Sequence, residues 1–394
     1  MFKTFNLKRI DFVLLTLIIS LNVFGIFAVG SARPDLQIKQ IEGMVVGLAL
    51  MLVISALDYH KIIYFAWVYY VINIVLLYLV ISIGSTGGGA QRWLTIGGFT
   101  FQPSEAAKIL LILFYAKFIM RYKDRIRTIP VTALSVALIL IPFYLIWKQP
   151  DMSTSIMVVV IFSVMMFVGG ISFRLVAGIF AVSLPTALIL FNMVLQEDQT
   201  LLSPYQRNRI LAFLHPEDFA DTTAYQTIYS MMAIGSGKLL GKGYNTNSLS
   251  SLLNSGYISQ SQTDFIFTVI GEEFGFIGAC AVVALIAAIS IKCFLNVRTA
   301  RDMAGMVICA GMGAWIGFQG IMNIGVATGT FPNTGIPLPF VSYGLTSLWS
   351  LYMGIGFLLN VRMQSAPVRS AKTVGRIGGI PDMPDLAEED AMLT

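Results

Sequence analysis

The stretch SQTDFIFTVIGEEFGFIGACAVVALIAAISIK, residues Ser261 to Lys292, decides the fold class of this chain. It begins as a polar segment, passes Asp264 where hydrophobicity starts, and then exceeds the roughly 20 apolar residues that a membrane-spanning helix needs. Glu272 and Glu273 follow about 12 Å deeper at the usual helical rise. Acidic groups inside a membrane are costly and usually face a bundle interior or a watery cavity, so they indicate a functional site. A helix-start aspartate with two structurally paired glutamates is the alternative interpretation.

Composition extends this conclusion to the whole chain. Of the 394 residues, 56% are hydrophobic and 12% are charged, whereas soluble proteins carry about 25% charged residues, so a water-soluble globule is excluded. The first apolar run is longer than a signal-peptide core of roughly 7 to 15 residues and is interpreted as an uncleaved span. The sequence predicts an all-α polytopic membrane protein with about ten transmembrane helices, at approximately residues 12–29, 43–57, 62–83, 105–120, 131–147, 153–170, 174–195, 264–292, 303–328 and 340–361.

The basic residues set the expected orientation. If the N-terminus is cytoplasmic, 17 of the 26 Lys and Arg residues lie on the cytoplasmic side, as the positive-inside rule favours. We therefore expect both termini in the cytoplasm and Asp264 at the outer surface. Because this topology accounts for most of the net charge of +5, a nucleic-acid partner is not indicated. The expected organisation is a membrane domain over residues 1–362, a large extracellular loop at 196–263 between helices 7 and 8, and a flexible cytoplasmic tail at 363–394.

The first unusual extracellular region covers residues 84–109. Its glycines permit a compact irregular loop, and Trp93 can anchor that loop at the membrane interface. The region then delivers Glu105 and Lys108 into a helix, where their i, i+3 spacing places both on one face. The two side chains either neutralise each other as a structural pair or contact a substrate directly.

The second region covers residues 196–263 and is long for a loop without function. Its segments around residues 205–219 and 224–243 are too hydrophobic for disorder, which indicates short amphipathic helices lying on the membrane. Arg207, Arg209, Lys238 and Lys242 offer cations to a phosphate-bearing lipid. Snorkelling of these side chains to ordinary anionic headgroups is the alternative.

The third region covers residues 323–347 between the last two helices. Pro332, Pro337 and Pro339, beside several glycines, prevent a continuous helix there. Irregular backbone near membrane depth is tolerated only where protein buries it or where it lines a cavity. The region is therefore either a cavity wall or a tight loop between two spans. The two histidines and three cysteines of the chain form no evident metal-ligand cluster.

Five ordered motifs resemble the SEDS family, which contains RodA, FtsW and a sporulation relative. The resemblance extends from the first helix to about Arg362. The segments DYH, YQRNRILAFLHPE and IGEEFGF are most like the RodA branch, whereas Met152 and Leu345 stand where leucine and glycine are more usual. The motifs are QRW (Gln91–Trp93), QPSEAAK (Gln102–Lys108), QPDMSTS (Gln149–Ser155), TDFIFTVIGEEFGFIG (Thr263–Gly278) and GIPLPFVSYG (Gly335–Gly344).

The resemblance implies a peptidoglycan glycosyltransferase that polymerises lipid II at the outer face of the bacterial cytoplasmic membrane, for rod-shape elongation or division. In this inverting reaction one sugar hydroxyl attacks the anomeric carbon of another unit, and a polyprenyl pyrophosphate leaves. A single carboxylate can accept the hydroxyl proton. No partner acid is required, because pyrophosphate is a good leaving group. Cations or a divalent metal, Mg²⁺ or Mn²⁺, would offset the developing charge, and no organic cofactor is implied.

The same resemblance assigns Asp264 as the catalytic carboxylate, because it matches the essential aspartate of the TDFIF motif. No residue is assigned as a metal ligand. The expected substrate-binding residues are Trp93 and Arg92 at the cavity rim, Glu105 and Lys108 within it, and Arg207, Arg209 and Lys242 as pyrophosphate contacts.

Two other functional classes remain open at this stage. A flippase that moves lipid II across the membrane would also have about ten helices and buried charges, but it needs polar groups along the whole crossing. A scaffold for cell-wall enzymes would leave the buried acids unexplained. The resemblance further implies a class B penicillin-binding protein as transpeptidase partner, together with other membrane proteins of the elongation or division complex.

Overall fold

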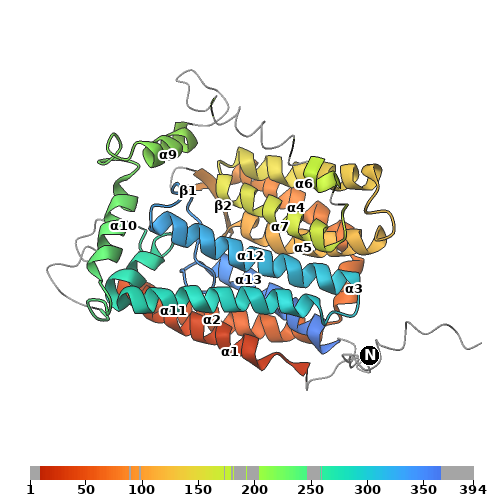
Figure 1. The fold of residues 1–394 in the computed structure, drawn as a ribbon, viewed down its shortest axis with the longest axis horizontal. Helices are drawn as coiled ribbons and strands as arrows, with labels where there is room; N and C mark the ends of the chain where they lie inside the picture. Colours follow the sequence, from red (N-terminus) through yellow and green to blue (C-terminus); the bar gives the residue numbers. More distant parts are fainter. Residues whose placement is uncertain are drawn as a thin grey trace, which may run out of the picture.

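The computed structural model shows a bundle of long helices with a small sheet and two shorter helices at one end (Figure 1). It describes residues 9–87, 90–96, 99–172, 174–178, 181, 192, 204–245, 258 and 260–364. Most of the expected span at 174–195 and nearly all of the expected tail at 363–394 lie outside these residues. The all-α prediction is confirmed for the membrane domain.

In the part that the structure describes, the first half of the chain forms seven helices and the three strands of the sheet. Its elements are α1 (Phe12–Ala32), α2 (Pro34–Ala56), α3 (Tyr59–Tyr64), α4 (Ala66–Ile83), β1 (Ser85–Gly87), β2 (Ala90–Ile96), β3 (Phe99–Phe101), α5 (Pro103–Arg121), α6 (Ile129–Lys148) and α7 (Met152–Val168).

The second half supplies two short helices and three long ones. They are α9 (Pro204–Leu214), α10 (Tyr225–Ser236), α11 (Ile266–Val297), α12 (Met303–Ala327) and α13 (Leu345–Met363). Within the described part of the chain, six helices have the length and hydropathy to cross a membrane: α1, α2, α4, α6, α11 and α12. Helices α5, α7 and α13 run beside them in the bundle (Figure 1).

Helix α12 occupies the centre of the bundle and packs against α5, α7, α11 and α13. Its many glycines allow neighbouring helices to approach closely, as is usual in membrane bundles. A Cβ on Gly311, for example, would lie 3.1 Å from side-chain atoms of both Ile112 and Met165. Helices α4 and α6, in contrast, expose many apolar side chains outward, as expected for surfaces that face lipid.

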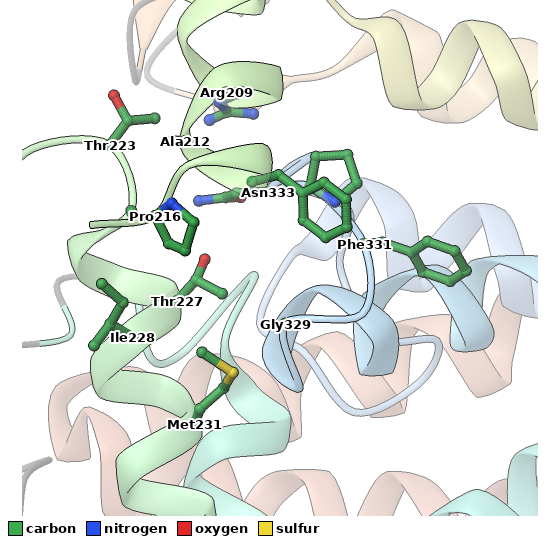
Figure 2. Close-up of a pocket in the computed structure, with 13 residues that line it drawn as sticks. Arg209, Ala212, Pro216, Thr223, Thr227, Ile228, Met231, Gly329, Phe331 and Asn333 are labelled. Atoms are coloured by element: carbon green, nitrogen blue, oxygen red, sulfur yellow. The ribbon is translucent and has the colours of Figure 1, made fainter. Parts of the chain in front are cut away.

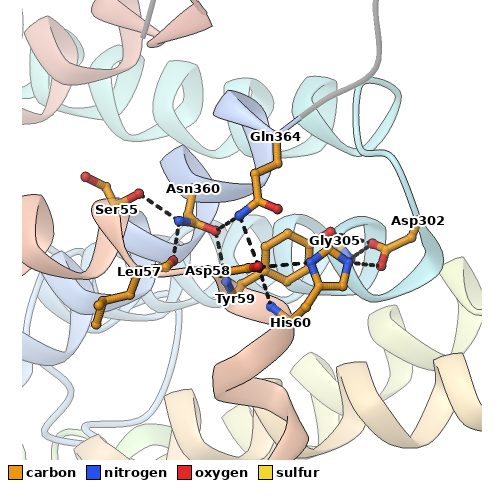
Figure 3. A network of polar contacts seen from close by, with 9 residues as sticks. All are labelled: Ser55, Leu57, Asp58, Tyr59, His60, Asp302, Gly305, Asn360 and Gln364. Atoms are coloured by element: carbon orange, nitrogen blue, oxygen red, sulfur yellow. Dashed lines mark hydrogen bonds and ion pairs between the residues drawn. The ribbon is translucent and has the colours of Figure 1, made fainter. Parts of the chain in front are cut away.

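The two ends of the described helical domain lie together at the end of the bundle away from the sheet. Arg362, near the end of α13, lies 3.7 Å from the carboxylate of Asp11, which caps the start of α1. At this end Asn360 also donates to the carbonyls of Ser55 and Leu57, within a polar network that includes His60 (Figure 3). The first described long helix therefore begins, and the last one ends, on the same side of the bundle, while the orientation of that side stays a prediction.

The region expected to be an irregular loop forms a three-stranded antiparallel sheet in the order β1-β2-β3. Ser85 pairs with Trp93, and Leu94 pairs with Phe101. Leu94 is buried while Thr95 is exposed, which is the alternation of a strand with one buried face. The expectation of an irregular backbone was therefore wrong: the chain between the glycines pairs as strands, and within β2 the polar and apolar residues alternate only from Leu94 to Ile96.

Helix α11 is broken at Gly275, whose φ of 64° and ψ of −161° are not helical. The chain that follows α10 hydrogen-bonds to this break: Phe276 N donates to Lys238 O at 2.9 Å, and Lys242 N donates to Glu272 O at 2.9 Å. Backbone groups at membrane depth require internal partners. The segment 238–243 supplies them, and it thereby fixes α10 to the first part of α11.

Candidate active site

Asp264 lies immediately before α11, at the same end of the bundle as the sheet, α9 and α10. The side-chain amide of Asn323 on α12 donates to the carbonyl oxygens of Asp264, at 2.8 Å, and Ile336, at 2.7 Å. Ser342 Oγ donates to the carbonyl of Thr263 at 2.6 Å. These bonds join the segment that carries Asp264 to the loop between α12 and α13, so two distant motifs form one rigid unit.

Gly335 in this loop lies where three charged side chains meet. A Cβ at this position would be 3.2 Å from Asp264 Oδ2, 3.7 Å from Arg209 Nη1 and 3.9 Å from Arg92 Nη1. The φ of Gly335 is +69°, in the left-handed region that favours glycine. The missing side chain leaves a small space between one carboxylate and two guanidinium groups, and this space is the centre of the candidate site.

The surroundings of Asp264 set its basicity. Burial raises the pKa of Asp264 above its ordinary value of 3.8, Arg209 and Arg92 lower it, and Asp151 raises it. The net direction is upward because removal from water disfavours the charged form. A carboxylate with a raised pKa accepts a proton more readily than a free aspartate does, which suits a general base.

The QPDMSTS motif holds Arg92 in place. The guanidinium Nη2 of Arg92 donates to the carbonyl of Pro150, which connects β2 to the start of α7. Next to it, Asp151 caps α7 by accepting from Thr154 N at 3.2 Å, and it also accepts from Ser104 Oγ at 3.3 Å. The sheet, α5 and α7 are thus joined directly behind the site. Trp93 follows Arg92 on β2 and is half-buried.

Glu105 and Lys108 form a buried ion pair with a separation of 2.7 Å and side-chain exposures of 3% and 1%. Lys108 also donates to Gln319 Oε1 at 2.9 Å, and Gln319 Nε2 donates to Pro337 O at 2.9 Å. Trp315 lies beside this lysine, with its ring centroid 4.8 Å from Lys108 Nζ. This arrangement supports the structural-pair interpretation, because the pair braces the loop that contains Gly335 instead of facing open space.

Helices α9 and α10 cover the site from outside and border a cavity of about 70 Å³ beside Arg209 (Figure 2). Arg209 lines this cavity and also reaches the space beside Asp264 at Gly335. The opposite wall comes from the loop after α12. The cavity is lined by Arg209, Ala212, Phe213, Pro216, Thr223, Ala224, Thr227, Ile228, Met231, Gly329, Phe331, Pro332 and Asn333.

The remaining predicted cations lie elsewhere. Lys242 forms an ion pair of 2.7 Å with Glu272, whose side chain is fully buried, so the structure places it at the break in α11 instead of among the charges around Gly335. Arg207 lies on α9 two residues before Arg209, and residues so spaced do not share a helix face. The structure brings Arg209 to Asp264, and the roles of Arg207 and Lys242 as pyrophosphate contacts stay predictions.

Sequence reasoning missed the positioning residues Asn323 and Gln319. Both lie on α12 inside an otherwise apolar run, and both are buried. A polar amide within a spanning helix is costly unless it is hydrogen-bonded. That cost is the signal that would have identified them.

The residues next to Gly335 in sequence carry oxygen atoms of the type that a divalent cation would need. Among the described residues, no three His, Cys, Asp or Glu side chains form a metal-ligand group. Asn333 Oδ1 and Thr334 Oγ1 are buried and lack hydrogen-bond partners in the described part of the chain. With one oxygen of Asp264 they match the ligand type of Mg²⁺, which retains waters and is often completed by substrate phosphates.

Comparisons with known sequences place this geometry in a family. Residues 6–366 match the family described as cell cycle protein, which comprises FtsW, RodA and SpoVE. A probable peptidoglycan glycosyltransferase FtsW of Trichlorobacter lovleyi is 32% identical over 95% of this chain and 98% of its own length. The peptidoglycan glycosyltransferase MrdB of Escherichia coli K12 is 33% identical over 91% of this chain and 95% of its own length.

Solved structures agree with the sequence comparison. The Thermus thermophilus rod shape determining protein RodA superposes with a TM-score of 0.67 at 26% identity, covering 91% of this chain and 98% of its own. A chain from a peptidoglycan synthase complex that coordinates polymerization and crosslinking gives a TM-score of 0.74 at 28% identity, covering 90% and 97%. The chain therefore belongs to the FtsW/RodA/SpoVE family of cell cycle proteins, the SEDS family.

Proposed function

We propose that this protein is a peptidoglycan glycosyltransferase that polymerises lipid II at the outer face of the bacterial cytoplasmic membrane, with Asp264 as the catalytic base. The observation that carries the proposal is the meeting of Asp264, Arg92 and Arg209 around Gly335. Relatives named as peptidoglycan glycosyltransferases match more than nine-tenths of the chain. FtsW and MrdB match at 32% and 33% identity, so the choice between division and elongation stays a prediction.

The reaction follows from the charges in the site. Asp264 accepts the proton of the 4-hydroxyl on one disaccharide, and that oxygen forms a bond to the anomeric carbon of another. The bond from this carbon to the pyrophosphate oxygen breaks, and the polyprenyl pyrophosphate leaves with the electron pair. Arg209 and Arg92 offset the negative charge on the leaving group. When bound, Mg²⁺ or Mn²⁺ would add positive charge there.

The location of the buried charges favours a transferase over a lipid II flippase. Within the long helices of the bundle that the structure describes, the buried charged side chains are Glu105, Lys108, Glu272 and Glu273. All four lie in the first two turns or so of α5 and α11, toward Asp264. Buried polar side chains such as Asn22, Asn73 and Ser290 continue along the helices, so the charged side chains are the ones that distinguish the two functions. A gathering of the buried charges near one end supports chemistry at one membrane surface over passage of a charged headgroup through the whole crossing.

The expected partner is a class B penicillin-binding protein that crosslinks the glycan. The similar chain from a peptidoglycan synthase complex that coordinates polymerization and crosslinking supports this partner. Other membrane proteins of the elongation or division complex are expected to join the same assembly.

The test reconstitutes the purified chain in liposomes with lipid II, alone and with its cognate penicillin-binding protein. Glycan chains formed by the wild-type protein would support the transferase. Labelled lipid II that moves between leaflets without any glycan, even with the partner present, would overturn the proposal in favour of the flippase.

A further inference from the structure

A second cavity lies at the opposite end of the bundle from Asp264, where α4 begins and α5 ends. Its volume is about 420 Å³, within the usual range of roughly 300–1,000 Å³ for small-molecule sites. Helix α5 separates it from the active-site end by about 25 Å at 1.5 Å per residue. The cavity is lined by Tyr64, Ala66, Trp67, Phe114, Lys117, Phe118, Arg121 and Tyr122.

The walls of this cavity are aromatic and already ordered. Trp67 packs edge-on against Phe114 with ring centroids 5.0 Å apart, and Tyr70 stacks on Phe114 at 4.5 Å. Tyr64 and Trp67 remain 72% and 48% exposed. Aromatic side chains of this kind gather at the level of lipid headgroups, which suits a cavity at the boundary between headgroups and acyl chains.

Two cations of α5, Lys117 and Arg121, line the same cavity. Their i, i+4 spacing makes them neighbours on one helix face, where like charges repel. Among the described residues, neither has a carboxylate within ion-pairing distance: the ion pairs present there involve other residues. An anion between the two side chains would remove this repulsion.

We infer that this cavity binds one anionic phospholipid. Its phosphate lies between Lys117 and Arg121, and the part of an acyl chain next to the headgroup lies against Trp67 and Phe114. Basic pockets between helices on the cytoplasmic side are suited to anionic headgroups, and the expected topology puts this end of the bundle on that side. The inference does not depend on the proposed enzymatic activity, because the site is at the far end of α5.

Native mass spectrometry of the full chain in detergent tests the inference. The assay titrates phosphatidylglycerol or phosphatidylcholine and compares three double variants with the wild type. Lys117→Gln/Arg121→Gln removes the two cations of the cavity. Lys123→Gln/Arg125→Gln removes two exposed cations from the same end of the bundle. Lys117→Arg/Arg121→Lys keeps both charges.

We expect one tightly bound phosphatidylglycerol per wild-type chain and weaker binding of phosphatidylcholine. Losing both cavity cations should weaken this binding about 30-fold, because each basic residue contributes about 1 kcal/mol near an anionic surface and 1.4 kcal/mol is tenfold. The matched variant at Lys123 and Arg125 should change binding less than about threefold. The charge-conserving variant should retain binding.

Several results would overturn the inference. Equal losses in the two glutamine variants would reduce the effect to general surface charge. Equal binding of phosphatidylcholine would remove the role of charge, and complete displacement by inorganic phosphate would assign a free-anion site. Lipid binding that appears only after removal of residues 365–394 would assign the cavity to the acidic segment AEED of the tail.

Discussion

A methyl group on Gly335 would enter the space between Asp264, Arg92 and Arg209. Its carbon would lie 3.2 Å from Asp264 Oδ2, which is closer than an ordinary van der Waals contact and forces a shift of a few tenths of an ångström. The left-handed backbone of Gly335 adds strain of about 1–2 kcal/mol for any other residue. The Gly335→Ala variant therefore disturbs the carboxylate and fills the place that a substrate hydroxyl has to reach.

We expect Gly335→Ala to reduce lipid II polymerisation on the order of 100-fold, because the methyl group occupies the place of the substrate hydroxyl and so keeps the reacting oxygen about 1 Å or more from its position. The assay measures glycan chains formed in liposomes. Gly170→Ala is the matched control, because Gly170 has a φ of +87° and nothing within 4 Å of an added Cβ. The control should carry similar strain and keep its activity. If Gly335→Ala keeps its activity within threefold of the wild type, or if the control loses as much activity, the space at Gly335 is not the place where the substrate hydroxyl meets Asp264.

Three further results are expected. Polymerisation should fall as the pH falls through the raised pKa of Asp264, because the protonated carboxyl cannot accept a proton. Arg209→Gln removes a charge that lowers this pKa, so the acid limb of the pH–rate profile should move to higher pH in that variant. An acid limb that does not move would contradict the assignment of Asp264 as the base. Lys242→Met should destabilise the protein by about 3–5 kcal/mol, since it leaves the buried carboxylate of Glu272 without its ion-pair partner. Adding Glu272→Gln should restore much of the lost stability, as measured by thermal unfolding. Absence of this rescue would show that the ion pair does not cause the loss. Asn323→Ala should lower the polymerisation rate at saturating lipid II about tenfold or more without abolishing folding, because it frees the backbone of Asp264; an unchanged rate would show that this hydrogen bond does not position the base.

Hydropathy predicted most of the helices because a membrane span requires a length of apolar sequence that few other structures contain. It did not predict the break in α11, since a single glycine such as Gly275 is common in spanning helices. The break depends on hydrogen bonds from residues 238–243, far away in the sequence. The sheet was missed because the alternation in β2 covers only Leu94 to Ile96 and glycine-rich segments flank it.

The candidate site was partly predictable from residue chemistry. Asp264 and Arg209 are charged residues beside apolar spans, and the structure brings them together with Arg92. The roles of Gly335 and Asn323 were not predictable, because one acts through a missing side chain and the other through backbone contacts between distant segments. The ion pair of Lys242 with Glu272 was not predictable, because the sequence alone does not show that the two residues are neighbours.

Asp264→Asn tests the central claim most directly, since it replaces the base with an amide of nearly the same shape. Wild-type and variant chains would be compared for glycan formation from lipid II in the same liposomes, with the penicillin-binding protein present and with matched thermal unfolding. The account predicts that glycan formation disappears in the variant while folding and partner binding persist. Polymerisation by Asp264→Asn at the wild-type rate would contradict the assignment of this carboxylate as the catalytic base.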